Sequence, residues 1–382
     1  MNAPKLRFKE FNDEWDYKIF DELINIKSES YNPSLKKENY KCIELEHINQ
    51  NTGTINGYCN SQDQKSNKNI FKKNEVLFGK LRPYLKKYWY ATFDGVCSSE
   101  IWVGKSKNQN IVTNKFIYDL FQSHYFLQLC NLSTGSKMPR ADWSFIKEQS
   151  IAIPNILEQK KISETLELLD KKIELQSKKI EALKLFKKGL NKFVFSNCTD
   201  EYKIENLIIE YSNKTTENNQ YEVLSSTANG IAFQNEYFNK QAASNNNTGY
   251  KIIPKGFITY RSMSDTGEFH FNIQDITDIG IVSPAYPVFN IKKNLVNKTY
   301  FVYYINENDG FKNEILSTKE GGTRYALSIT KFKTLNILLP KIEEQIKYSK
   351  YINIIINKIQ LEEKKFEKLI QLKKGLMQNM FV

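Results

Sequence analysis

The sequence predicts an α+β protein in which two globular domains are separated by two long antiparallel coiled-coil helices, with a pseudo-twofold internal duplication. Three observations predict this architecture. Residues 151–195 recur as residues 337–381, at an offset of 186, with 19 of 45 aligned positions identical. Each copy has the pattern of one long helix, and each follows a region of short β-type runs and turns. A repeat at this spacing indicates tandem duplication of one module.

The repeated segment is predicted to be a helix because its apolar residues recur at alternating spacings of four and three. Each copy opens with an apolar run closed by proline (Pro154, Pro340), continues with Glu-Gln, and ends in Lys-Lys-Gly-Leu. Proline suits a helix start, since the residue before a proline avoids helical angles. The stretch from Glu158 to Phe195 would span roughly 57 Å as a helix.

The apolar stripe predicts a seam between the two helices. The seam residues are Ile162, Leu166, Leu169, Ile173, Ile180, Leu183 and Leu190 in the first copy, and Tyr348, Ile352, Ile355, Ile359, Phe366, Leu369 and Leu376 in the second. Two breaks in the stripe fall at matching places, Gln176 with Glu362 and Lys187 with Lys373. The alternative is two separate amphipathic surface helices. The matching breaks favour two helices that pack on each other.

The duplication also predicts the domain division. We expect globular domains over residues 1–157 and 197–343, and helices over 158–196 and 344–382. Strand-type runs are Asn74–Arg82, Trp89–Phe93, Glu100–Gly104, Lys255–Arg261 and Tyr286–Ile291, and a helical stretch follows in each domain, over Asn114–Cys130 and Asn297–Leu316. The globular parts have diverged while the helices stayed alike, which indicates one scaffold carrying two specificities.

The overall charge indicates a polyanionic partner. The chain of 382 residues has a net charge of +12, so nucleic acid is the first expectation and a membrane surface the second. Codon bias of an AT-rich genome is an alternative source of part of this basicity. The N-terminus lacks the apolar core of a signal peptide, and no run of 18 apolar residues predicts a membrane span. The expected location is cytoplasmic, where scattered cysteines stay reduced.

No catalytic or metal-binding constellation is recognisable in the sequence. The five cysteines include no Cys-x-x-Cys pair, and His47, His124 and His270 are not spaced as metal ligands. The stretch Gly104–Ser106 lacks the first glycine of a phosphate-binding loop, because position 99 is Ser99. We therefore expect no cofactor and no metal in this chain, and any chemistry to belong to its partners.

Two kinds of basic cluster are candidates for contact with DNA. Phe78–Tyr90 interleaves basic and aromatic residues, and Lys137–Arg140 has a counterpart in Gly321–Tyr325. Lysine and arginine attract phosphates, and arginine also binds guanine edges. The candidate DNA-binding residues are Lys80, Arg82, Tyr84, Lys86, Lys87, Lys137 and Arg140 in the first domain, and Tyr260, Arg261, Thr323, Arg324 and Tyr325 in the second. The plain alternative for each cluster is a turn with a solvated basic side.

Together these features resemble the specificity subunit of bacterial type I restriction-modification systems. The resemblance rests on the duplicated helix module, on Pro4–Phe8 through Trp15, and on Phe78–Leu85. The second globular region lacks the Leu-Arg-Pro-Tyr tetrapeptide of the first. The resemblance implies two target recognition domains, each reading one half of a bipartite, asymmetric target in double-stranded DNA.

The same resemblance implies a non-catalytic subunit with catalytic partners. Two methyltransferase subunits and the restriction translocase-nuclease subunits would bind this chain, and they would use S-adenosylmethionine, ATP and Mg²⁺. Two other classes of function stay open. One is a coiled-coil scaffold whose globular domains bind protein, which salt-dependent binding to duplex DNA would exclude. The other is a self-contained DNA-modifying enzyme, which the missing cofactor motifs disfavour.

Overall fold

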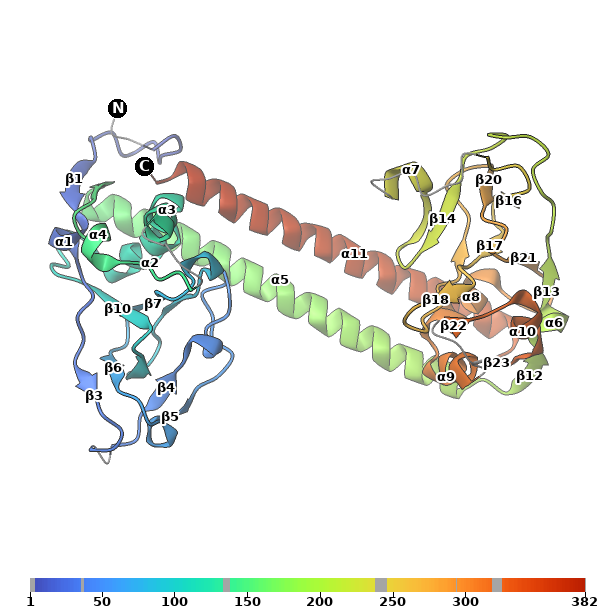
Figure 1. Ribbon diagram of the computed structural model, residues 1–382, viewed down its shortest axis with the longest axis horizontal. Coiled ribbons are helices and arrows are strands. Elements are labelled where there is room, and N and C mark those ends of the chain that lie inside the picture. The colour runs from blue at the N-terminus through green and yellow to red at the C-terminus, as the bar shows by residue number, and fades with distance from the viewer. Residues whose placement is uncertain are drawn as a thin grey trace. The chain divides into compact units, whose positions relative to one another are not determined.

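The computed structural model describes residues 4–35, 38–132, 138–237, 246–292, 294–317 and 325–381. The chain divides into two compact units. Unit 1 comprises residues 1–178 and 363–382, and unit 2 comprises residues 179–362. Each unit contains one globular part and a portion of each long helix, α5 (Ile156–Ser196) and α11 (Ile342–Asn379) (Figure 1). The division into domains at 157, 196 and 343 stays a proposal, since both units share the two helices.

Unit 1 is a mixed α+β structure. Its strands are β1 (Asp16–Ile19), β2 (Ile24–Asn25), β3 (Ser30–Tyr31), β4 (Lys41–Ile43), β5 (Cys59–Asn60), β6 (Lys68–Phe71), β7 (Val76–Gly79), β8 (Tyr88–Tyr90), β9 (Gly95–Ser98), β10 (Ile101–Ser106) and β11 (Ser150–Ile153). Its short helices are α1 (Phe20–Leu23), α2 (Asn114–Gln122), α3 (His124–Leu132), α4 (Trp143–Ile146) and the 3-10 turns η1 (Leu45–His47), η2 (Ser61–Asp63) and η3 (Pro83–Leu85). The sheets have the orders β1-β11, β2-β10-β7-β8 and β3-β6-β9-β4-β5.

Unit 2 repeats the central part of this topology. Its strands are β12 (Asp200–Lys203), β13 (Ile208–Glu210), β14 (Leu224–Thr227), β15 (Gly230–Phe233), β16 (Lys251–Pro254), β17 (Ile258–Thr259), β18 (Met263–Ser264), β19 (Asn272–Ile273), β20 (Ile279–Val282), β21 (Val288–Ile291), β22 (Tyr325–Ala326) and β23 (Asn336–Leu339). Its short helices are α6 (Ile204–Leu207), α7 (Gln234–Tyr237), α8 (Lys298–Glu307), α9 (Asp309–Ser317) and α10 (Ile329–Thr334). The pair β12-β23 and the sheet β13-β21-β17-β19 correspond to β1-β11 and β2-β10-β7-β8.

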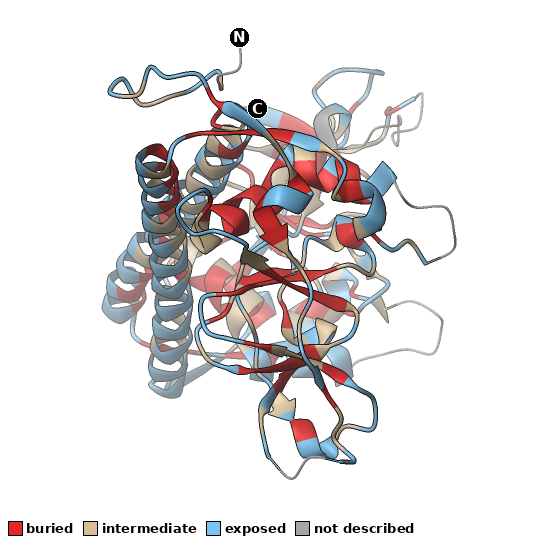
Figure 2. Ribbon diagram, turned by 90° about the vertical axis from the view of Figure 1, so that its left-hand side faces the viewer, coloured by how far each residue is buried: buried red, intermediate tan, exposed pale blue. Residues whose placement is uncertain are grey.

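The two long helices are paired and antiparallel. In unit 1, Asp170 of α5 forms an ion pair of 2.6 Å with Lys373 of α11. In unit 2, Lys179 of α5 lies 3.0 Å from Glu362 of α11. The residue numbers rise along α5 while those of the partners fall along α11, so the helices run in opposite directions. Every position of the predicted stripe is buried or half-buried, and the outward faces of the helices are exposed (Figure 2).

Three of the four break positions of the stripe hold charges, and these charges are paired. Lys187 forms an ion pair of 2.8 Å with Glu307 in α8, and Lys373 pairs with Asp170. Glu362 is only 3% exposed and is matched by Lys179. Buried charges persist when they are paired, so the two breaks do not interrupt the packing.

Both long helices begin two residues earlier than the sequence predicted. For α5 the cause is Asn155, whose side-chain oxygen accepts a hydrogen bond of 3.0 Å from the backbone N–H of Glu158 and so caps the first turn. Glu158 is fully buried. Its carboxylate accepts two hydrogen bonds of 2.7 Å from Arg7 and one of 3.2 Å from the Trp15 indole. The N-terminal segment is thereby fixed to the start of the helix.

The helical stretches that follow the strands differ from the prediction in one respect. Each is two helices, α2 and α3 in unit 1 and α8 and α9 in unit 2. The breaks are at Ser123 and Asn308, whose side chains accept the backbone N–H groups of Phe126 at 3.2 Å and Phe311 at 2.9 Å. A side-chain acceptor of this kind starts a new helix. Aromatic rings form a large part of the main cores; they include Phe78, Phe121 and Phe126 in unit 1 and Phe271, Phe289 and Phe332 in unit 2.

Candidate nucleic-acid interface

The loop between β7 and β8 in unit 1 presents the first basic cluster. Gly79, the last residue of β7, lies close to Leu45, since a Cβ atom at this position would come within 2.8 Å of the Leu45 side chain. Arg82 and Lys86 flank the turn η3 and both have left-handed backbone angles, with φ of 52° and 51°. Such angles are unfavourable for residues with a Cβ atom and are concentrated at functional sites. Pro83 is buried, which fixes the turn to the domain.

The second basic cluster lies against this loop. The backbone N–H of Arg82 donates to Pro139 O at 2.8 Å, and that of Ala141 donates to Lys80 O at 2.8 Å. Leu81 and Arg140 form an isolated antiparallel bridge. Two clusters that are 58 residues apart in the sequence, counted from Arg82 to Arg140, therefore form one surface. Lys137 lies outside the described residues.

The side chains of this surface differ in their availability. Arg82, Tyr84 and Lys86 are exposed and Lys80 is half-buried. The Lys87 ammonium donates to the carbonyl of Leu45, so it holds the loop.

Arg140 is already engaged by a carboxylate. It donates two hydrogen bonds to Glu100, at 3.0 and 3.2 Å, and this pairing raises the pKa of Arg140. A phosphate would have to compete with Glu100 for this guanidinium. Among the described residues, the surface therefore offers Lys80, Arg82, Tyr84 and Lys86 as groups without a side-chain partner.

Unit 2 has the equivalent surface between β17 and β19. The strand β18 lies in this loop and pairs with β22, with Ser264 opposite Tyr325 and Met263 opposite Ala326. This pairing corresponds to the Leu81–Arg140 bridge of unit 1. Tyr325 is half-buried and Arg261 is exposed. Thr323 and Arg324 lie outside the described residues.

Tyr260 is a correction to the predicted site. Its side chain is fully buried, and its hydroxyl donates to the carbonyl of Leu327 at 3.1 Å. Its ring packs on Phe271 with a centroid distance of 4.4 Å. Tyr260 therefore belongs to the core and is not available to a ligand, whereas the side chain of its neighbour Arg261 is exposed.

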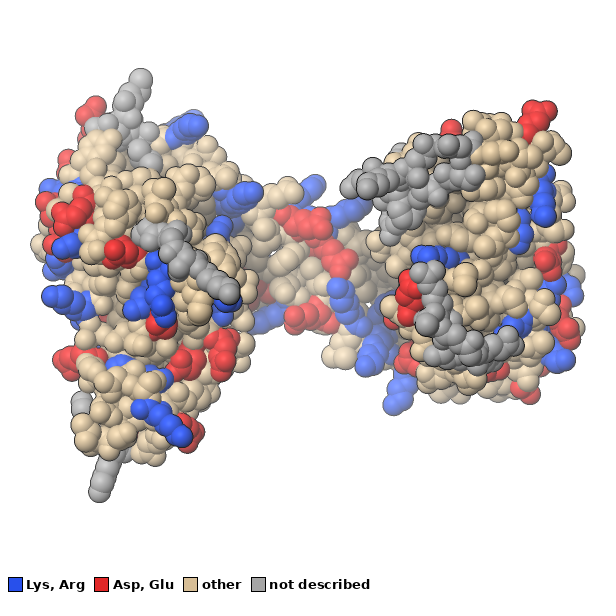
Figure 3. Space-filling view, in the orientation of Figure 1, with Lys and Arg blue, Asp and Glu red and all other residues tan. Residues whose placement is uncertain are grey.

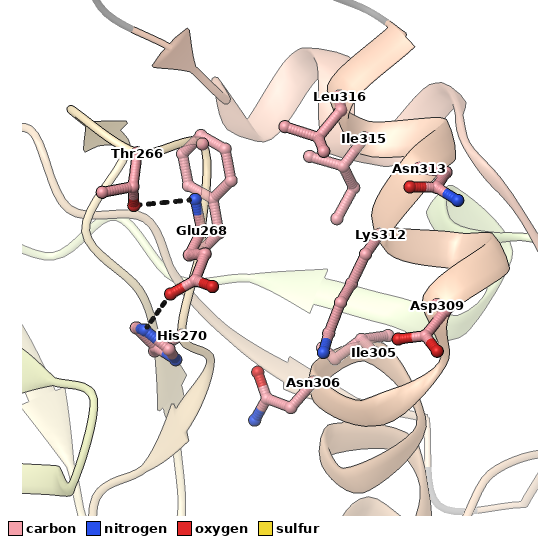
Figure 4. A pocket seen from close by; sticks show the side chains of 12 residues that line it. Thr266, Glu268, His270, Ile305, Asn306, Asp309, Lys312, Asn313, Ile315 and Leu316 are labelled. Carbon is pink, nitrogen blue, oxygen red and sulfur yellow. Dashed lines mark hydrogen bonds and ion pairs between the residues drawn. The ribbon is translucent and has the colours of Figure 1, made fainter. Parts of the chain in front are cut away.

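A hollow of 510 Å³ lies beside the same loop in unit 2. It is lined by residues Thr266 to His270 and by side chains of α8 and α9, with Ile305, Ile315 and Leu316 as its apolar part (Figure 4). Glu268 and Asp309 are also in the lining, and Glu268 lies 3.9 Å from His270. With two carboxylates against one lysine, Lys312, this hollow is a poor site for phosphate.

Charge is not gathered in one patch on the face drawn in Figure 3, where basic and acidic side chains are interspersed over both units. Within the described ranges, no group of three or more His, Cys, Asp and Glu side chains is placed to bind a metal ion. His47 has a structural role, since its Nδ1 accepts the backbone N–H of Glu44 at 3.0 Å. As far as the chain is described, no helix has both the length and the hydrophobicity of a membrane span.

Comparison with known proteins places this architecture in a family. The model of the "Type I restriction modification DNA specificity domain" matches twice, over residues 12–185 and 200–371. The EcoDI type I restriction enzyme specificity subunit of Escherichia coli is 27% identical over 158 residues. That match covers 41% of this chain and 34% of the length of that relative.

Two solved structures share the fold. The type I restriction-modification S subunit of M. genitalium has a TM-score of 0.62 and 17% identity, with 100% of this chain and 99% of that one covered. A structure concerned with assembly and conformational transition of the type I R-M system has a TM-score of 0.56 and 16% identity, over 95% and 96%. The two family matches leave little of the chain outside them, and the chain therefore belongs to the type I restriction-modification DNA specificity family, with that domain present twice.

Proposed function

We propose that this chain is the DNA-recognition subunit of a type I restriction-modification complex and reads a bipartite, asymmetric target with one domain per half. One observation carries the proposal. In both units, a segment that precedes the long helix pairs with a loop at the same position of the sheet. This loop lies between β7 and β8 in unit 1 and between β17 and β19 in unit 2. The framework is repeated and the side chains on it differ. That combination suits two readers with different base preferences.

The candidate DNA-binding residues differ in the kind of contact that their side chains suit. Lys80 and Lys86 suit phosphate contacts, because an ammonium group binds as a point charge. Arg82 and Arg261 suit either a phosphate or a guanine edge. Tyr84 and Tyr325 supply aromatic contacts. Lys137, Thr323 and Arg324 remain proposed contacts, while Lys87 and Arg140 are proposed to hold the first loop in shape.

A domain exchange tests the two-reader proposal. Residues 197–343 are replaced by the equivalent region of a relative with a different target, and methylation is mapped across the genome of cells that carry either chain. We expect one half of the methylated target to change and the other half to persist. A change in both halves, or a continuous native target, would show that the domains do not read independently. Duplex binding that does not weaken with salt would favour the protein-binding scaffold instead.

We also propose that the chemistry belongs to partner subunits, which use S-adenosylmethionine, ATP and Mg²⁺. The purified chain is then expected to show no methyl transfer, no ATP hydrolysis and no cleavage. Methyl transfer should appear when the methyltransferase subunit is added. Activity that persists in the rigorously purified chain would identify a self-contained enzyme.

The outward faces of the long helices suit two copies of one partner. Unit 1 exposes Leu168 and Leu175 of α5 and Leu372 of α11, at 61%, 66% and 52%. Unit 2 exposes the residues 186 positions away, Ile354, Leu361 and Phe186, at 61%, 53% and 61%. Exposed apolar side chains that recur in this way mark an interaction surface. Two equivalent surfaces would accept two methyltransferase subunits.

The glycine of the Lys-Lys-Gly-Leu motif supports the same proposal. Gly189 and Gly375 lie inside helices, where glycine costs roughly 0.5–1 kcal/mol relative to alanine. A Cβ atom at either position would meet nothing within 4 Å among the described residues. The chain itself gives no reason for these glycines. Around Gly189 the helix also exposes Leu185, Phe186 and Phe193, at 72%, 61% and 58%, so a partner helix could pack closely over the glycine.

Gly189→Ala and Gly375→Ala separate the effect of these glycines on helix stability from their effect on partner binding. Each should raise the free energy of unfolding of the lone chain by about 0.5–1 kcal/mol, because alanine favours the helix. Each should also weaken binding of the methyltransferase subunit, measured by calorimetry or light scattering of the complex, because a methyl group now stands at the closest approach. Unchanged partner binding in both variants would show that the glycines lie outside the interface.

A further inference from the structure

A second hollow, in unit 1, borders the proposed DNA-reading loop. Its volume is 470 Å³, within the range of roughly 300–1,000 Å³ that is usual for ligand sites. Three parts of unit 1 form it: the β7–β8 loop and its neighbour Asn51, the junction of α2 and α3, and the end of α11. The lining residues are Asn51, Lys86, Tyr88, Gln122, His124, Leu127, Ile370, Lys373, Lys374, Met377 and Gln378.

The charge of this lining is one-sided. Three lysines and one histidine line the hollow, and no aspartate or glutamate is among the lining residues. Lys373 is held in place by Asp170 at 2.6 Å and by the side-chain oxygen of Gln122 at 3.1 Å. Neither Lys86 nor Lys374 has a carboxylate partner among the described residues. These two ammonium groups leave an uncompensated positive site beside His124, in contrast to the hollow of unit 2, where one lysine, Lys312, is accompanied by Glu268 and Asp309.

The rim of the hollow is preorganised. Lys86 and Asn51 both have left-handed backbone angles, φ 51° and φ 57°, and the Asn51 N–H donates to Lys86 O at 2.9 Å. Two such residues locked together hold the loop in one shape. His124 is the first residue of α3, whose positive helix end adds to the attraction for an anion.

We propose that this hollow is a phosphate-binding site in which Lys86, His124 and Lys374 hold one backbone phosphate of the DNA. The inference rests on the proposed function and deepens it, because it gives α11 a direct part in DNA binding besides its role as a spacer. The site is specific to unit 1. In unit 2 the helix that corresponds to α3 is α9, and it begins with Asp309 where α3 begins with His124; this carboxylate would repel a phosphate.

Salt-dependent DNA binding by the full chain tests whether the hollow holds a phosphate of the DNA. Affinities for a target duplex and for an unrelated duplex are measured between 50 and 200 mM salt for wild type, Lys374→Gln and Lys86→Gln. Each substitution should weaken binding to both duplexes alike and lower the slope of log affinity against log salt by about one unit. Lys364→Gln is the matched control, because Lys364 is an exposed lysine of α11 within unit 1 that does not line the hollow. An unchanged slope for Lys374→Gln would overturn the proposal.

Inorganic phosphate tests the site without DNA. The ring resonances of His124 are followed by NMR while phosphate is added to wild type and to the Lys86→Gln/Lys374→Gln double variant. We expect a saturable shift in wild type only. Phosphate binding together with an unchanged DNA slope would mean that the site takes free phosphate, which contradicts the DNA assignment. If wild type bound no duplex, the proposed function would fail, and the phosphate titration alone would still decide whether the hollow binds phosphate.

Discussion

The side-chain oxygen of Gln159 accepts a hydrogen bond of 3.1 Å from the backbone N–H of Thr113, the residue that caps α2. Its amide nitrogen donates to Pro154 O at 2.9 Å. Gln345 repeats the arrangement, accepting from Asn297 N–H at 2.9 Å and donating to Pro340 O at 2.8 Å. This geometry explains the repeated glutamine. The glutamine locks the start of each long helix to the helix that covers the sheet of the same unit.

Replacing this glutamine should therefore destabilise the unit that contains it. Gln159→Leu removes the partner of the half-buried Thr113 N–H and of the buried Pro154 carbonyl, at a cost of about 1–3 kcal/mol. Urea unfolding measures the loss, and hydrogen exchange should be faster at the Thr113 amide. Gln371→Leu, at an exposed position of α11, is the control and should change stability by no more than about 0.5 kcal/mol. A Gln159→Leu chain as stable as wild type would contradict this role.

The long helices offer a comparison between an inner and an outer leucine on α5. Leu169 is 6% exposed and Leu175 is 66% exposed. Leu169→Lys buries an unpaired charge in the helix pair and should lower the free energy of unfolding by about 3 kcal/mol or more. Ile355→Lys should act in the same direction from α11. Leu175→Lys should stay within about 0.5 kcal/mol of wild type and should instead weaken partner binding. Equal stability of the two α5 variants would mean that α5 and α11 do not rely on the seam.

The helices were predictable from sequence because a 3.5-residue periodicity over many turns is a local signal. The breaks between α2 and α3 and between α8 and α9 were not. Ser123 lies between Gln122 and His124, and Asn308 lies between Glu307 and Asp309. Their hydrogen bonds to Phe126 and Phe311 turn them into caps. Serine and asparagine in a helical pattern carry no certain signal, because the same residues also occur inside helices.

Tyr260 and Arg261 test the corrected site, since the structure separates their roles. Tyr260→Phe removes the hydrogen bond to Leu327 O and should cost about 1 kcal/mol of stability, with DNA affinity and its salt slope unchanged. Arg261→Gln should leave stability unchanged and weaken DNA binding. A uniform loss with a lower salt slope would identify a phosphate contact, and a loss of roughly 1–3 kcal/mol at one base position would identify base readout. A changed salt slope for Tyr260→Phe would contradict its burial.

The candidate site was only partly predictable, because the contacts that build it join residues that are far apart in the sequence. Arg261 and Tyr260 are adjacent in sequence, and composition alone does not separate an exposed arginine from a core tyrosine. The rings that bury Tyr260 include Phe332, 5.8 Å away, which is remote in sequence. The pairing of Leu81 with Arg140 is equally non-local. Sequence indicated the basic clusters one by one, and the fold brings them together.

Asp119 of α2 gives a prediction for pH. This residue is 2% exposed, and its Oδ2 has no hydrogen-bond partner within the described part of the chain. Burial raises the pKa of Asp119 to about 7, against the effects of the nearby Ser163 hydroxyl and of Lys115 and Lys373, which lower it. An aspartate in the unfolded chain has a pKa of about 3.9. Between about pH 4 and pH 7 the unfolded state therefore releases a proton that the folded state keeps, so the free energy of unfolding falls as the pH rises.

Asp119→Asn removes this titration and resembles the protonated side chain. The variant should match wild type near pH 4, gain relative stability as the pH rises to about 7, and keep a constant advantage above about pH 8, where the carboxyl is ionised in both states. Urea unfolding of both chains from pH 5 to pH 8 measures the difference. The direction in which the stability difference changes with pH is the test. If the advantage of the variant shrank with rising pH, or if the two stability curves stayed parallel, burial would not be holding Asp119 neutral. The Asp119 carboxylate would then be stabilised in the folded chain.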